Sequence, residues 1–73
     1  MYEIRKHKTE IREYYENERL KMIAVYAASG QLLDYTEFHE NGEIKKRLVY
    51  ELDGTLVSDM EWDENGNPIK GFS

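Results

Sequence analysis

The sequence predicts an all-β fold, an antiparallel up-and-down meander of five or six strands built from 12-residue repeats. An aromatic residue recurs every 12 positions, followed each time by a turn dipeptide and usually an aliphatic residue: Tyr14, Tyr26, Phe38, Tyr50 and Trp62. About nine residues remain between successive turns, enough for one strand of ~30 Å at ~3.3 Å per residue. Connections this short join antiparallel neighbours, so the strands follow one another across the sheet.

The turn of each repeat is marked by two residues, and four of the five pairs end in glycine: Asn17-Glu18, Ser29-Gly30, Asn41-Gly42, Asp53-Gly54 and Asn65-Gly66. Glycine in such pairs is typical of a hairpin position with φ > 0. Glu18 stands where the other repeats have glycine, so it must accept φ > 0 or form a different turn.

The apolar positions of the repeats carry even numbers, and this restricts the length of the hairpin loops. A two-residue loop would place the apolar side chains of alternate strands on opposite faces, whereas an odd loop keeps them together. We therefore predict three-residue loops such as Glu40-Asn41-Gly42, with a type I turn, a left-handed glycine and a G1 bulge. On the odd-numbered face this register predicts an apolar row and a row of alternating charge: Val25–Leu33–Val49–Val57 and Lys21–Glu37–Lys45–Glu61.

The even-numbered apolar residues are predicted to form one face, in two ladders where aromatic side chains alternate with aliphatic ones. We predict that these residues bind a partner: Leu20, Tyr26, Leu32, Phe38, Ile44, Tyr50, Leu56 and Trp62. An apolar sheet face must be covered in a soluble domain, and residues 1–13 are too few and too polar to cover it. The sequence therefore predicts a homodimer, or a larger symmetric assembly, packed through this face.

The chain is predicted to be a single β-repeat domain over residues 1–73, with an atypical N-terminal unit (1–13) and five repeats (14–73). We favour an irregular start that runs into a strand near residues 7–15. A short helix is the alternative for this segment, because Ile4, Ile11 and Tyr15 lie near helical spacing.

The composition excludes several classes of function. The 73 residues include 15 acidic and 10 basic ones, a net charge of −5, which disfavours nucleic acid as a partner. The absence of cysteine excludes disulfides and thiolate metal sites and is compatible with a reducing compartment. No apolar run approaches the ~20 residues of a membrane span. We therefore expect a cytoplasmic protein that binds neither nucleic acid nor membrane.

No group of residues indicates catalysis, a cofactor or a metal site. His7 and His39 are the only histidines, neither lies in an arrangement typical of a catalytic triad, and His39 is expected to be a solvated loop residue. Asp63-Glu64-Asn65-Gly66-Asn67 partly resembles a calcium loop but lacks its terminal bidentate glutamate, so turn chemistry is the favoured interpretation. The chain is predicted not to be an enzyme and to carry no cofactor.

Two charged groups have structural interpretations. Lys45-Lys46-Arg47 lies on a predicted strand, so its side chains point alternately to opposite faces and form no nucleic-acid patch. Asp34 and Lys46 fall diagonally on one predicted face and are expected to pair with each other.

Several repeats resemble those of known families. Tyr14-Tyr15-Glu16-Asn17 and Phe38-His39-Glu40-Asn41-Gly42-Glu43-Ile44 are similar to the variant MORN repeats of bacterial YwqK-type antitoxin proteins. Tyr50-Glu51-Leu52-Asp53-Gly54 and Trp62-Asp63-Glu64-Asn65-Gly66-Asn67-Pro68-Ile69 also resemble the YD repeats of RHS-type toxins. The resemblance covers residues 14–72, and it implies stacked β-hairpins and a binding or antitoxin-like role in bacteria.

The expected function is therefore a non-enzymatic protein–protein interaction module, antitoxin- or immunity-like, that presents a sheet face to a protein partner. One alternative is a small-ligand or carbohydrate-binding sheet with Trp62, Phe38 and Tyr50 as a stacking platform. Another is a structural repeat whose role lies in assembly.

Overall fold

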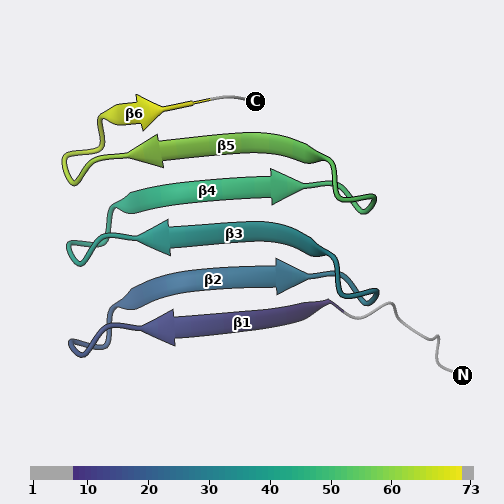
Figure 1. The fold of residues 1–73 in the computed structure, drawn as a ribbon. Helices are drawn as coiled ribbons and strands as arrows, with labels where there is room; N and C mark the ends of the chain where they lie inside the picture. Colours follow the sequence, from purple (N-terminus) through teal and green to yellow (C-terminus); the bar gives the residue numbers. More distant parts are fainter. Residues whose placement is uncertain (1–7, 72–73) are drawn as a thin grey trace, which may run out of the picture.

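Six antiparallel strands form a single sheet in a computed structural model that describes residues 8–71. In chain order they are β1 (Thr9–Tyr14), β2 (Leu20–Tyr26), β3 (Leu32–Phe38), β4 (Ile44–Tyr50), β5 (Leu56–Trp62) and β6 (Pro68–Lys70). Each strand pairs with the next one along the chain, so the order in the sheet is the order in the sequence (Figure 1). The predicted all-β meander is confirmed.

The N-terminal strand settles the choice between strand and helix for the part of the segment that the structure describes. Thr9–Tyr14 is β1 and pairs with β2, with Ile11 opposite Ala24. Ile4 and His7 lie outside the described residues.

All five turns have the same backbone hydrogen bonds. In the third turn the His39 N–H donates to the Glu43 carbonyl at 2.8 Å, and the Gly42 N–H donates to the His39 carbonyl at 2.9 Å. Gly42 has φ 96°, and Glu18 occupies the corresponding position of the first turn with φ 71°. The predicted three-residue loop with a left-handed residue is confirmed, and Glu18 accepts φ > 0.

The residue before the left-handed position stabilises these turns through its side chain. The Asn41 Oδ1 accepts a hydrogen bond from the Glu43 N–H at 2.9 Å, and the Asn17 and Asp53 side chains do the same in their turns. A short Asx side chain reaches the backbone two residues later, which is why Asn and Asp recur at this position.

A second irregularity follows each turn and was not predicted. Phe38 lies opposite Ile44 as expected, but the next pair is Glu37 with Lys46, so Lys45 is an extra residue on β4. The same shift occurs in the other hairpins, where the extra residues are Lys21, Leu33, Val57 and Ile69. One inserted residue reverses the face to which every later side chain of the strand points.

The predicted single even-numbered face is therefore wrong. Tyr26 lies on the same side as Ala24, which is opposite Tyr35, whereas Phe38 lies on the same side as Thr36. Alternation along β3 puts Tyr35 and Thr36 on different faces. The eight predicted partner-binding residues divide between a Trp62 face, with Leu20, Phe38, Ile44 and Trp62, and a Tyr50 face, with Tyr26, Leu32, Tyr50 and Leu56.

The predicted rows of the odd-numbered face are wrong for the same reason. Instead of an all-apolar row, the sheet pairs Val25 with Asp34, Asp34 with Val49 and Val49 with Ser58. A row of alternating charge exists with other members, Glu37, Lys46, Glu61 and Lys70, and the uncharged Met22 takes the β2 position of this row.

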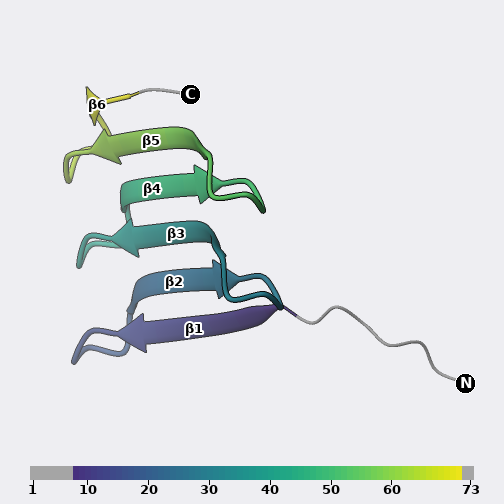
Figure 2. The same cartoon turned by 45° about the vertical axis from the view of Figure 1, so that its right-hand side comes forward.

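The sheet has no second layer in the part of the chain that the structure describes. Contacts between strands join only sequence neighbours, and the described chain remains one layer when viewed at 45° (Figure 2). Among residues 8–71 only Ala24, 2% exposed, and Ala27, 9% exposed, are buried. Both faces of the sheet are therefore open in the isolated chain.

The turn geometry predicts that Gly42→Val lowers the free energy of unfolding by more than ~1 kcal/mol, because a β-branched residue is strained at this φ. Space is not the obstacle, since an added Cβ would come no closer than 3.7 Å, from the Arg19 side chain. Glu43→Val in the same turn is the control, with an expected change within about 0.5 kcal/mol. Urea unfolding is the measurement, and equal midpoints for the two variants would contradict the left-handed assignment.

The observed register predicts that Lys46→Glu and Glu61→Lys are coupled in a double-mutant cycle by ~0.2–1 kcal/mol, because the two side chains form a partly exposed ion pair. The atoms Lys46 Nζ and Glu61 Oε2 are 3.3 Å apart. Lys45→Glu combined with Glu61→Lys is the matched control and should show no coupling. Coupling of Glu61 to Lys45 rather than to Lys46 would refute the extra residue at Lys45.

Candidate binding surface

The Trp62 face carries an apolar row along one turn edge of the sheet. The row contains Tyr14, Leu20, Phe38, Ile44 and Trp62, paired across the hairpins as Tyr14 with Leu20 and Phe38 with Ile44. Tyr14 and Ile44 are 54% and 39% exposed, and the other members are half-buried. Aromatic and aliphatic side chains thus alternate on a surface that is open to solvent.

Further apolar side chains extend this row toward the centre of the Trp62 face. The register places Ile23 and Met60 in the next row on this face, and Val25 and Val49 in the row beyond it. All four are half-buried. The apolar surface therefore spans β2 to β5 rather than a single hairpin.

The charges at the centre of the Trp62 face are paired with one another. The Arg47 Nη2 donates to the Asp34 Oδ2 at 2.8 Å, and this hydrogen bond raises the pKa of Arg47. The Thr36 hydroxyl lies 3.2 Å from Asp34 Oδ1. Asp34 thus pairs with Arg47, and the predicted Asp34–Lys46 pair is wrong because the bulge puts Lys46 on the other face. The face presents apolar surface with little uncompensated charge at its centre.

Side chains from the preceding turns hold the backbone under the aromatic row. The Tyr15 hydroxyl donates to the Phe38 carbonyl at 2.6 Å, and the His39 Nε2 lies 3.0 Å from the Trp62 carbonyl. Because a carbonyl oxygen only accepts, Nε2 carries the His39 proton. Each bond spans 23 residues. It joins a turn to the last residue of the strand that enters the next turn on the same edge of the sheet, Phe38 of β3 or Trp62 of β5.

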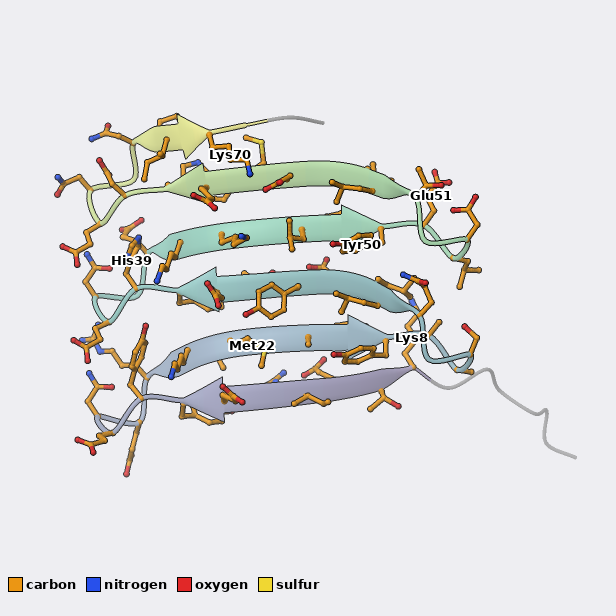
Figure 3. The ribbon with its side chains drawn as sticks, viewed as in Figure 1. Lys8, Met22, His39, Tyr50, Glu51 and Lys70 are labelled. Atoms are coloured by element: carbon orange, nitrogen blue, oxygen red, sulfur yellow. The ribbon has the colours of Figure 1, made fainter. Side chains whose placement is uncertain are left out.

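His39 was expected to be solvated, and that prediction is wrong. The side chain is half-buried at the turn edge, where Figure 3 places it away from Tyr50 and Glu51. Asn41 in the same turn donates from Nδ2 to the Glu64 carbonyl at 2.9 Å. The only sequence signal for these contacts is that Tyr15 and His39 occupy the same place in repeats two units apart.

The Tyr50 face is more highly charged. Lys46 pairs with Glu61, and the Lys70 Nζ lies 3.0 Å from Asp59 Oδ2, a hydrogen bond that raises the pKa of Lys70. The Tyr35 hydroxyl donates to Glu37 Oε2 at 2.5 Å. This hydrogen bond, together with partial burial, raises the pKa of Tyr35 to about 12.

Neither the hollows nor the acidic turns of the described chain assemble catalytic groups. A hollow of about 570 Å³ at the turn edge opposite His39 is lined by Lys8, Ala27, Ala28, Ser29, Leu33 and Leu52. Among the described residues of this lining Lys8 is the one ionisable group, so these residues form no acid–base pair there.

The Asp63 carboxylate stabilises the turn in which it lies. Its Oδ1 accepts hydrogen bonds from the Asn65 and Asn67 N–H groups, both at 2.9 Å. The backbone hydrogen bond from Asn67 lowers the pKa of Asp63. No group of three or more potential metal ligands occurs among residues 8–71.

Comparison with protein-family models, curated proteins and solved structures finds no match for this chain. The resemblance to MORN and YD repeats therefore stays a prediction from the residues that carry it. Within the described residues, no helix has the length and hydropathy that a membrane crossing requires.

The Tyr35–Glu37 hydrogen bond predicts a pH dependence of stability. The folded-state pKa of about 12 lies above the ordinary 10.0, so the contribution is present below pH 10 and is lost as the pH rises toward 12. Between these pH values the unfolded chain has released a proton that the folded chain retains. Urea midpoints of the wild type should therefore fall more steeply over this range than those of Tyr35→Phe.

Tyr50→Phe, which removes a hydroxyl elsewhere on the same face, is the control and should keep the steep wild-type dependence. If Tyr35→Phe follows the wild type across this pH range, the hydroxyl makes no stabilising bond to Glu37.

Proposed function

We propose that this chain is a non-enzymatic interaction module that binds a protein partner through its Trp62 face. The observation that supports the proposal is the open single layer: an apolar row runs along this face, and no other described segment covers it. Contiguous apolar surface of this kind on a small domain marks interaction sites.

The make-up of the Trp62 face favours a protein over other partners. Trp62, Phe38 and Tyr14 supply large aromatic anchors, the residue type that carries most of the binding energy in protein interfaces. The ion pair between Arg47 and Asp34 reduces the cost of desolvating charge at the centre. A protein that presents an apolar surface fits this arrangement, with polar contacts at its rim.

The resemblance to YwqK-type repeats supports an antitoxin- or immunity-like role for this binding in the bacterial cytoplasm. In such a role the partner would be a toxin, and the chain would act by covering part of the toxin's surface. The absence of an assembled catalytic group in the described residues is compatible with that use.

A carbohydrate-binding role is the second candidate, because Phe38 and Trp62 lie on the same face at the same turn edge and could both stack on sugar rings. The register removes Tyr50 from this platform, since Tyr50 lies on the other face. Two aromatics provide a smaller platform than the three that the sequence predicts.

The proposal predicts that Trp62→Asp abolishes capture of a protein partner from a bacterial lysate, because it removes an aromatic anchor and places a charge in the apolar row. Tyr50→Asp, an equivalent change on the opposite face, should retain capture, and circular dichroism verifies that both variants are folded. Trp62 is the only tryptophan, so a blue shift of its emission on adding the purified partner reports burial of this face.

Two outcomes would contradict the protein-binding proposal. Loss of capture with Tyr50→Asp but not with Trp62→Asp would assign binding to the Tyr50 face. Saturable binding of a glycan that Trp62→Asp abolishes, without any captured protein, would favour the carbohydrate candidate.

A further inference from the structure

The outer edge of β1 is the longest unpaired edge in the described sheet. β1 contacts β2 alone among the strands, and all six of its residues are exposed. The opposite edge is divided between two shorter segments. β6 has three residues and begins with Pro68, which lacks an N–H donor, and within residues 8–71 β5 has no partner strand beyond β6 over residues 56–60. A free strand edge is a template for pairing with another chain.

We propose that β1 pairs antiparallel with β1 of a second copy of this chain about a two-fold axis, so that the two sheets become one continuous sheet. This inference goes beyond the proposed function and is independent of it, because it uses the edge of the sheet rather than the Trp62 face.

The backbone restricts the possible registers of this pairing. The Tyr15 N–H donates to the Arg19 carbonyl across the first hairpin. Because backbone groups alternate along a strand, the odd-numbered residues of β1 bond to β2 and the even-numbered ones point outward. Outward-pointing Glu10 and Arg12 must therefore face outward-pointing residues of the partner. Only registers in which even-numbered residues oppose even-numbered ones satisfy this requirement.

The side chains select one of these registers. When Ile11 lies opposite Ile11 of its partner, Glu10 of each protomer faces Arg12 of the other, which makes two pairs of opposite charge. The adjacent registers place Glu10 opposite Glu10, or Arg12 opposite Arg12, and like charges directly opposite destabilise a sheet. The edge of β1 is therefore self-complementary in charge and in apolar contact.

Contacts within one chain already arrange these groups on one face. Arg12 Nε donates to Glu10 Oε2 of the same strand, so both side chains lie on one side of the sheet. In the dimer they would form a cluster of four alternating charges across the two-fold axis. Both copies of the Trp62 face stay open in this arrangement, so dimerisation through β1 and partner binding are compatible.

The first test uses Ile11→Cys in a chain that has no cysteine of its own. In the proposed register the two Ile11 residues form a non-hydrogen-bonded pair with Cα atoms about 4.5 Å apart, within the range that a disulfide spans. Ile44→Cys is the matched control, because Ile44 and Ile11 are similarly exposed, 39% and 44%. Under mild oxidation at low micromolar concentration, Ile11→Cys should form the disulfide dimer at least about tenfold faster.

The second test exchanges charges across the axis. Glu10→Arg and Arg12→Glu should each sediment as a monomer of 8.7 kDa, because like charges face each other in both homodimers. An equimolar mixture should sediment as a heterodimer of twice that mass, because every cross-axis pair is then of opposite charge. This rescue does not follow from effects on the fold of either chain alone.

The proposal is overturned if the two cysteine variants oxidise at equal rates, if Ile44→Cys oxidises faster, or if the mixture of charge variants stays monomeric. The face-binding proposal is tested separately by the Trp62→Asp capture, so failure of one leaves the other standing.

Discussion

The hairpin turn, a three-residue loop together with the two residues that close it, is the constraint on which the rest of this structure depends. Each turn closes through the same pair of backbone hydrogen bonds and requires one residue with φ > 0, supplied by glycine in four turns and by Glu18 in the first. Because every turn has the same length, strands begin at a 12-residue spacing from Leu20 to Pro68 and stack in chain order. Tyr15 and His39 then reach from one turn to the backbone two repeats later, which joins the local units into one sheet.

The bulge after each turn decides how the two faces differ. Without it the apolar residues at even positions would share one face, and the other face would carry the shorter apolar row of Val25, Leu33, Val49 and Val57 beside a row of charged residues. With it the aromatic residues of alternate hairpins point in opposite directions, so each face receives one apolar row at one turn edge. The Trp62 face combines its row with Ile23, Met60 and a paired Arg47 and Asp34, whereas the Tyr50 face carries the ion pairs of Lys46 and Lys70.

A sheet without a second layer derives its stability from neighbouring strands rather than from a shared core. Only two alanines are buried in residues 8–71, so most apolar side chains remain partly in contact with water. Such a layer is stabilised when a partner covers one of its faces or continues its edge. Covering a face removes apolar surface from solvent, and continuing the edge removes unpaired backbone groups from solvent. The proposed roles of the Trp62 face and of β1 are two consequences of this one property.

The sequence alone determined the period, the order of the strands, the loop length and the positive φ of Gly42, because turn chemistry is local and is repeated five times in one chain. It also determined the hairpin-closing pair of Phe38 with Ile44, which follows from the loop length. Tertiary structure decided the rest: the extra residue at Lys45, and hence the face of each aromatic residue and the pairing of Asp34 with Arg47. A bulge at Lys45 has no residue signature such as glycine, since it depends on how the twisted strands pair and not on the conformational preference of one residue. The role of His39 was likewise hidden, because its hydrogen-bond acceptor is brought near only when the hairpins stack.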